Sequence, residues 1–309
     1  MKNINLYIVC FTLLLFLSYF SSVQASTSQK IQNISGDIKT VNLASVSAIA
    51  VDSKTGSVLF EKNSNIVMPI ASITKLMTAI VTLDAKLSLK EKIRFIKEDK
   101  QNINNYYSRI RIGSELSRGD TLRIALMSSE NLAASALSRA YPGGSIAFVK
   151  AMNAKAKALG MKHSHFVNSS GLSEKNVSTV SDLSKMVAAA AKYPLIKKYT
   201  TTKTYTARFT KPRYILGYTN TNVLVRTGHK DVKLSKTGYL NEAGRCLTMV
   251  RKIGKKDVIL VMLDSFGKRS PIGDANRIKK WLQNGNLGKV ARSAANYERM
   301  KLAQYSKSN

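Results

Sequence analysis

The chain has 309 residues, of which 44% are hydrophobic and 7% aromatic. This composition supplies enough apolar surface for a sizeable core and excludes a disordered tail, and the length predicts one domain or at most two. Lysine and arginine total 49 against 18 aspartate and glutamate, which gives a formal net charge of +31. A charge this large predicts an anionic partner without saying which one.

Residues 1–25 are typical of a secretory signal peptide. Lys2 supplies the charged start, residues 8–20 form a mostly apolar run, and residues 23–25 form a small-residue cleavage site. The apolar run is too short to span a bilayer comfortably, so we expect a secreted, periplasmic protein. Cleavage removes one positive charge and leaves +30. Export argues against nucleic acid as the anionic partner and favours the cell wall. Peripheral contact with an anionic membrane surface is a further expectation.

The pattern after the signal peptide predicts three segments. Residues 26–43 are polar and are interpreted as a linker. Residues 44–284 are expected to form the folded domain, and residues 285–309 a basic C-terminal tail with five basic residues and one acidic residue. Because the mature chain keeps a single cysteine, Cys246, an internal disulfide is excluded.

The predicted elements run from strands through helices and back to strands. In chain order they are strands at 47–52 and 57–61, a helix at 72–85, helices near 121–128, 131–141, 145–159 and 180–193, irregular structure or short hairpins over 195–230, strands at 231–236, 245–251 and 257–264, and a helix near 273–283. The helices are predicted from apolar residues at helical spacing and from caps. This order predicts an α+β fold in which the two ends of the chain share one antiparallel sheet.

Ser72 and Lys75 are the first candidate catalytic pair. Residues three apart lie on one face of a helix, so the amine can reach the hydroxyl, and the helix N-terminus can stabilise an oxyanion. The three histidines are His163, His165 and His229. None of them lies in a triad or metal-binding motif, so histidine is a poor alternative base. Taken alone, this pair is better interpreted as an ordinary N-cap serine beside a solvated lysine. The same spacing occurs by chance at Ser265 and Lys268, in a predicted loop.

Two further motifs strengthen the catalytic interpretation. The triplet Ser129-Glu130-Asn131 falls between two predicted helices, where a loop can present its side chains. The triplet Lys236-Thr237-Gly238 ends a predicted strand and is followed by Tyr239. The same letters at residues 54–56 are interpreted as a turn. Three motifs in this order, separated by 57 and 107 residues, seldom arise by chance.

The set S-x-x-K, S-x-N and K-T-G resembles the penicillin-interacting serine acyl-enzymes, which are the penicillin-binding proteins and serine β-lactamases. Longer stretches within residues 45–284, such as 69–79 and 236–239, resemble the low-molecular-mass D-alanyl-D-alanine peptidases. Residues 127–131 and 141–144 resemble the endopeptidase branch of that family. The resemblance implies a serine β-lactamase/transpeptidase-like fold, an antiparallel sheet with helices on both faces and a helical subdomain.

The resemblance also implies roles for individual residues. Ser72 is expected to be the nucleophile that forms an acyl-enzyme, and Lys75 its base, with its pKa lowered by partial desolvation and by the charge of Lys236. Ser129 is expected to relay the proton to the leaving amine. The substrate-binding residues are expected to be Asn131 for the substrate amide, Lys236, Thr237 and Gly238 of the K-T-G motif for the acidic end of the peptide, and Tyr239, whose backbone N–H completes the oxyanion hole with that of Ser72. No metal and no cofactor are expected.

The resemblance implies hydrolysis of the D-alanyl to diaminopimelate cross-links of peptidoglycan. No E-x-x-L-N deacylation loop occurs, so β-lactams are expected to acylate Ser72 and remain as inhibitors. A carboxypeptidase that trims pentapeptide stems with the same residues stays open as an alternative, as does a non-catalytic basic wall-binding protein. The chain ends 71 residues after Gly238, which leaves no room for the second β-domain of the larger carboxypeptidases.

Overall fold

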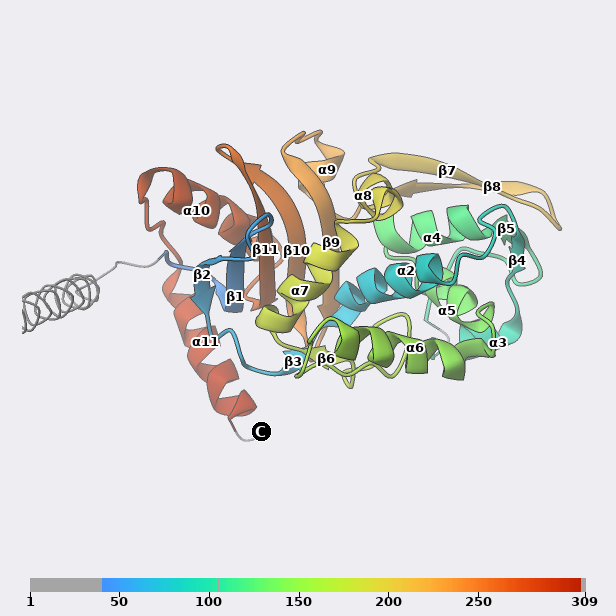
Figure 1. Cartoon of the computed structure of the whole chain (residues 1–309), viewed down its shortest axis with the longest axis horizontal. Helices are drawn as coiled ribbons and strands as arrows, with labels where there is room; N and C mark the ends of the chain where they lie inside the picture. The colour runs from blue at the N-terminus through green and yellow to red at the C-terminus, as the bar shows by residue number, and fades with distance from the viewer. Residues whose placement is uncertain (1–40, 105, 307–309) are drawn as a thin grey trace, which may run out of the picture. The chain divides into compact units, whose positions relative to one another are not determined.

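A five-stranded antiparallel sheet organises the protein, whose computed structural model describes residues 41–104 and 106–306. The strands are β2 (Val58–Lys62), β1 (Ser45–Asp52), β11 (Lys256–Ser265), β10 (Gly244–Ile253) and β9 (Val232–Leu240), in that spatial order. Strand β1 pairs with β11, so the two ends of the folded unit share one sheet as predicted (Figure 1). The predicted signal peptide, residues 1–25, and residues 26–40 of the predicted linker lie outside the described residues.

Helices cover both faces of this sheet. Helix α7 (Val180–Ala190) packs against β1, β10 and β11, and α10 (Ser270–Asn284) packs against the same three strands. Side chains along a strand alternate between the two faces, yet all eight residues of β1 are buried. Both faces are therefore covered, which explains why β11 is an almost continuous apolar run and not an alternating one.

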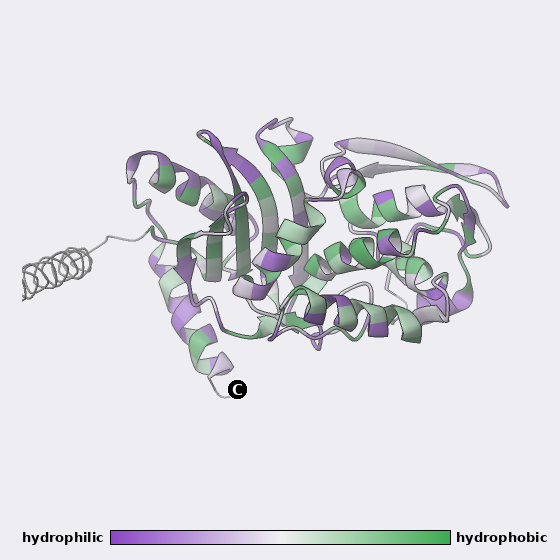
Figure 2. Cartoon of the chain, in the orientation of Figure 1, coloured by the Kyte–Doolittle hydropathy of each residue, from purple (hydrophilic) through white to green (hydrophobic). Residues whose placement is uncertain are grey.

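A helical subdomain packs beside the sheet, around the predominantly hydrophobic helix α2 (Figure 2). Its helices are η1 (Ala71–Thr74), α2 (Lys75–Asp84), α3 (Lys97–Gln101), α4 (Arg118–Met127), α5 (Asn131–Arg139), α6 (Gly144–Ala158) and α8 (Pro194–Thr200). The short helix α9 (Val223–Arg226) lies at the end of β9 (Figure 1). The short strands of the subdomain are paired as β3 (Met68–Pro69) with β6 (Val177–Ser178), β4 (Lys92–Arg94) with β5 (Glu115–Ser117), and β7 (Thr204–Phe209) with β8 (Tyr214–Thr219). None of the described helices is long and apolar enough to cross a membrane.

Four helices of the described chain occur where the sequence predicted none: α3, α8, α9 and α11. Helix α8 begins at Pro194, directly after the helix predicted near 180–193, because proline ends one helix and is also well suited to the first turn of the next. Helix α11 (Arg292–Tyr305) occupies most of the segment that was expected to be a basic tail, and it packs against β1. The short-hairpin expectation for residues 195–230 holds for β7 and β8, between which the chain turns at 210–213.

Helix α11 is attached to the sheet through a buried carboxylate. Asp264 of β11 accepts hydrogen bonds from the hydroxyls of Tyr297 and Tyr305, and Lys301 lies 3.3 Å from it. Asp264 is fully buried, and these three partners offset the free-energy cost of burying its carboxylate. The opposing residue Gly244 has no side chain, and a Cβ there would overlap the carboxylate. Residues 285–306 are thus part of the folded unit.

Candidate active site

Ser72 lies in the short helix η1, and Lys75 is the first residue of α2. The backbone just before Ser72 is held between two glycines. A Cβ on Gly171 would overlap the carbonyl oxygen of Ala71, and a Cβ on Gly238 would lie 3.2 Å from the Ser72 nitrogen. Ala71 itself has a φ of +46°, in a region that L-residues seldom adopt. Close packing, and not helix propensity, therefore sets the position of Ser72.

The Lys75 amine is enclosed by three acceptors. Its Nζ donates to Ser72 Oγ at 2.8 Å, to Asn131 Oδ1 at 2.7 Å and to the carbonyl of Ser170 at 2.6 Å. These contacts use all three donors of an ammonium group. The side chain is fully buried, and burial lowers the pKa of Lys75 to about 7, although the charge of Glu130 opposes this shift. At neutral pH a substantial fraction of the Lys75 amine is therefore uncharged and able to accept a proton.

A second buried lysine approaches from β9. Lys236 Nζ donates to Ser129 Oγ at 2.9 Å and to the Thr237 carbonyl at 2.7 Å. Burial and then the positive charge of Lys75 lower the pKa of Lys236 well below its usual range. The sequence analysis expected the charge of Lys236 to lower the pKa of Lys75; burial is the main cause for Lys75, and the repulsion acts mainly on Lys236. Ser129 has a φ of +63°, a strained backbone of the kind that clusters at functional sites.

Six of the eight predicted site residues line one cavity of about 450 Å³: Ser72, Ser129, Asn131, Thr237, Gly238 and Tyr239. The other two, Lys75 and Lys236, are buried and reach the Ser72 and Ser129 hydroxyls of this cavity. The structure thus brings together residues that lie up to 167 positions apart in the sequence. We refer to this cavity as the active-site cavity.

Strand β9 forms one wall of the active-site cavity and is an edge strand of the sheet, paired only with β10. Thr237 pairs with Leu247 and Gly238 with Cys246 in that ladder. The opposite edge of β9 packs near η1, and no strand within residues 41–104 and 106–306 pairs with the backbone groups there. An edge of this kind can bind an extended peptide by adding a strand, with side chains held in flanking pockets.

Several residues of the site gave no signal in the sequence. The Ser170 carbonyl that bonds Lys75 is a backbone group on a loop, and Thr221 receives a hydrogen bond of 2.6 Å from the Thr237 hydroxyl across 16 positions. Glu130 is partly buried and caps α5 by accepting a hydrogen bond from the Leu132 nitrogen. Burial raises its pKa, and a hydrogen bond with the Ser108 side chain opposes the shift.

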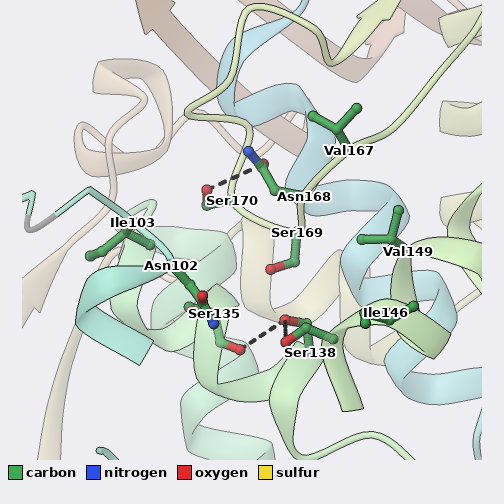
Figure 3. Close-up of a pocket in the computed structure, with 11 residues that line it drawn as sticks. Asn102, Ile103, Ser135, Ser138, Ile146, Val149, Val167, Asn168, Ser169 and Ser170 are labelled. Atoms are coloured by element: carbon green, nitrogen blue, oxygen red, sulfur yellow. Dashed lines mark hydrogen bonds between the residues drawn. The ribbon is translucent and has the colours of Figure 1, made fainter. Parts of the chain in front are cut away.

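The loop that supplies the Ser170 carbonyl also borders a separate cavity of about 350 Å³. Figure 3 shows the hydroxyls of Ser135, Ser138, Ser169 and Ser170 on one side of this cavity and the aliphatic side chains of Ile146, Val149 and Val167 on the other. Asn168 holds the loop by accepting hydrogen bonds from the Ser170 hydroxyl and the Gly171 nitrogen. The cavity is lined by uncharged groups and lies behind the loop that positions Lys75.

Among the described residues, no histidine or carboxylate side chain lines the active-site cavity. Neither His163, His165 nor His229 lines the active-site cavity. Across residues 41–104 and 106–306, no three His, Cys, Asp or Glu side chains are grouped closely enough to hold a metal ion. The Ser72 hydroxyl therefore lies on a backbone that packs closely against two glycines, and it is hydrogen-bonded to a buried amine whose pKa is lowered. This is the arrangement of an activated nucleophile.

Comparison with known proteins supports the same chemistry. The family model described as D-alanyl-D-alanine carboxypeptidase matches residues 33–267. A D-alanyl-D-alanine endopeptidase of Pseudomonas aeruginosa is 46% identical over 286 residues, which cover 93% of this chain and 91% of that protein.

Solved structures confirm the predicted fold. The Streptomyces K15 DD-transpeptidase is 29% identical with a TM-score of 0.74, over 79% of this chain and 98% of that one. Penicillin-binding protein D2 from Listeria monocytogenes, solved in an ampicillin-bound form, is 29% identical with a TM-score of 0.67, over 78% of this chain and 98% of that one. With a buried lysine bonded to a cavity serine, a shared fold and a family match over most of its length, this chain belongs to the D-alanyl-D-alanine carboxypeptidase family.

Proposed function

We propose that the protein is a serine D-alanyl-D-alanine endopeptidase that hydrolyses the D-alanyl to diaminopimelate cross-links of peptidoglycan. The observation that carries this proposal is the 2.8 Å contact between Lys75 Nζ and Ser72 Oγ, made by an amine whose pKa is lowered to about 7. The similarity to a relative named as an endopeptidase over 93% of the chain supports the choice of bond.

Acylation begins at Ser72. Neutral Lys75 accepts the proton of the Ser72 hydroxyl as Oγ attacks the carbonyl carbon of the D-alanine, and the backbone N–H groups of Ser72 and Tyr239 bind the oxyanion that forms. The close approach of Gly238 to the Ser72 nitrogen supports this role, because it brings the backbone of β9 beside that of η1. These N–H dipoles are already oriented before the oxyanion forms, so they do not have to reorient during the reaction.

Release of the amine uses the second half of the site. Ser129 relays a proton to the leaving nitrogen, and its bond to Lys236 Nζ at 2.9 Å connects it to the second buried amine. Asn131 orients the substrate amide, and the Thr237 hydroxyl with Lys236 binds the carboxylate next to the cleaved bond. Water then attacks the acyl-enzyme, which returns Ser72 to its free form.

β-Lactams are proposed as inhibitors that acylate Ser72 and stay bound. The similarity to a penicillin-binding protein solved with ampicillin supports this proposal. We further propose export to the periplasm through residues 1–25, a linker over 26–43 and a catalytic domain that begins at residue 44. The high positive charge holds the enzyme on anionic peptidoglycan, with peripheral contact to anionic membrane lipid.

The test is a digest of purified muropeptides with the mature protein and its Ser72→Ala variant, analysed by mass spectrometry. We expect cross-linked dimers to become monomers with wild type only, because the variant lacks the nucleophile. Release of only the terminal D-alanine from pentapeptides would instead identify a carboxypeptidase. An identical digest from both proteins, together with no labelling by fluorescent penicillin, would overturn both enzyme assignments.

A further inference from the structure

A second pocket adjoins the active-site cavity, and Thr221 lines both. This pocket has a volume of about 560 Å³ and is lined by Arg109, Ser128, Glu130, residues 217–221 and Arg226. We call it the basic pocket. The hydrogen bond of 2.6 Å between the Thr237 and Thr221 hydroxyls marks the boundary between the two spaces. A molecule held at Thr237 can therefore extend into the basic pocket without leaving the protein surface.

Two arginines give the basic pocket its charge. Arg109 Nη2 donates to the Gly217 carbonyl at 2.6 Å, and its guanidinium lies 5.1 Å from the centre of the Tyr218 ring. Arg226 Nη1 donates to the Asn220 carbonyl at 2.7 Å. Within the described part of the chain, no carboxylate lies within ion-pair distance of either one. Each guanidinium carries five N–H groups, so both retain donors for an anion.

Glu130 is the single carboxylate among the described residues that line this pocket, and its carboxylate is already hydrogen-bonded. Its carboxylate accepts a hydrogen bond from the Leu132 nitrogen and another from the Ser108 side chain. Glu130 lies between Ser129 and Asn131, so this wall of the basic pocket belongs to the same segment as two residues that line the active-site cavity. The pocket thus presents two exposed cations against one partly buried, internally bonded carboxylate.

The two possible substrates differ in the group that follows the cleaved bond. A pentapeptide ends in one D-alanine, whose carboxylate is held at Thr237 in the proposed function. A cross-link continues, because the leaving group is a diaminopimelate whose side chain leads to a second α-carbon and to the rest of an anionic peptide. Only the cross-linked substrate can place atoms beyond Thr237 and Thr221.

We propose that the basic pocket binds the released strand of a cross-linked substrate, with Arg226 and Arg109 bound to a carboxylate of that strand. This inference rests on the proposed function and names the residues that favour the cross-link over a free pentapeptide end. Charge-assisted bonds from arginine to carboxylate are among the stronger interactions available for such selection.

The experiment measures kcat/KM for a purified cross-linked dimer and for a pentapeptide monomer with wild type, Arg226→Gln and Arg109→Gln. Glutamine keeps a donor for the backbone carbonyl that each arginine bonds but removes the charge. The matched control is Arg299→Gln on α11, which removes the same charge from an exposed residue outside both pockets. Labelling by fluorescent penicillin checks that the Ser72 site of each variant is intact.

We expect Arg226→Gln to lower the dimer-to-pentapeptide ratio of kcat/KM about tenfold, the loss of roughly one charged hydrogen bond. Arg109→Gln should lower it in the same direction, and Arg299→Gln should keep the wild-type ratio. Equal losses on both substrates, or a ratio that matches the Arg299→Gln control, would overturn this inference while wild-type cleavage of the dimer upholds the endopeptidase function. A wild type that labels with penicillin but cuts no dimer would overturn the endopeptidase function and this inference with it.

Discussion

Two lysine side chains buried side by side dominate the chemistry at the scale of single residues. Lys75 and Lys236 are 0% and 1% exposed, and no carboxylate forms an ion pair with either one among the described residues. Burying an unpaired charge is costly, so such groups give up protons well below the usual pKa of lysine. The lowered pKa of Lys75 supports its proposed role as an amine base at neutral pH.

This state of Lys75 predicts a pH dependence. The pKa of Lys75 is lowered from 10.5 to about 7, so the amine is protonated below about pH 7 and free to accept a proton above it. The rate constant for acylation of Ser72 by fluorescent penicillin should therefore rise through about pH 7 and level off at higher pH. Stopped-flow measurement from about pH 6 to about pH 9 gives the profile.

The control for this profile is Lys75→Arg, which keeps a positive charge that cannot be lost. Its acylation should be slower than wild type by roughly 10²–10⁴-fold and should show no rise near neutral pH. A wild-type rate constant that stays flat across the same range would contradict the role of Lys75 as base.

At the scale of elements, the contact between the loop at Gly171 and helix η1 determines where Ser72, the proposed nucleophile, lies. Gly171 has a φ of +77°, and a Cβ there would overlap the Ala71 carbonyl. We expect Gly171→Ala to destabilise the protein by about 1–3 kcal/mol from overpacking, in addition to about 1 kcal/mol from the left-handed backbone. Penicillin acylation should also slow, because η1 must move. Urea unfolding and the labelling rate measure the two effects.

The chain offers a matched control for this substitution. Gly56 has a φ of +75° in the turn between β1 and β2, with no heavy atom within 4 Å of the place that an alanine methyl group would take. Gly56→Ala should therefore show only the backbone cost of about 1 kcal/mol, with wild-type acylation. Equal behaviour of the two variants would show that the contact with Ala71 does not position Ser72.

Helix α11 depends on the buried carboxylate of Asp264. Replacing it in Asp264→Ala leaves Lys301, which is 6% exposed, without its partner, and strands the Tyr297 and Tyr305 hydroxyls. We expect a loss of about 3–5 kcal/mol in the free energy of unfolding, measured by urea titration. Asp257→Ala, which removes an exposed pair with Lys233, should cost about 1 kcal/mol or less. Similar losses in both variants would mean that α11 is not held by this carboxylate.

For the whole molecule, the excess of 49 basic over 18 acidic side chains acts as a long-range attraction to anionic polymers. We expect the Ser72→Ala protein to sediment with purified peptidoglycan sacculi at low salt and to be released as ionic strength rises above about 0.15 M, where the screening length falls to about 8 Å. Sacculi whose carboxyl groups have been amidated are the control and should retain little protein. Binding that is insensitive to both salt and amidation would exclude a role for net charge.

Much of the fold was predictable because it depends on local patterns. The continuous apolar run of β11 and the amphipathic spacing of α2 and α7 predicted those elements close to where they lie. Helix α8 was missed because Pro194 ends one helix and begins the next, and both interpretations use the same residue. Helix α11 was missed because its sequence is polar overall, with few buried residues, and its position depends on Asp264 of β11.

The sequence by itself determined the pairing of Ser72 with Lys75, since residues three apart meet on one helical turn, and the motif order indicated which distant residues belong to the same site. Only the tertiary structure decided that Lys75 is buried, because the Ser170 carbonyl comes from 95 positions away and Asn131 from 56. It also decided that Thr221 lines both the active-site cavity and the basic pocket. Spacing is a property of near neighbours along the chain, whereas desolvation and the shape of a pocket depend on every segment that packs around a side chain.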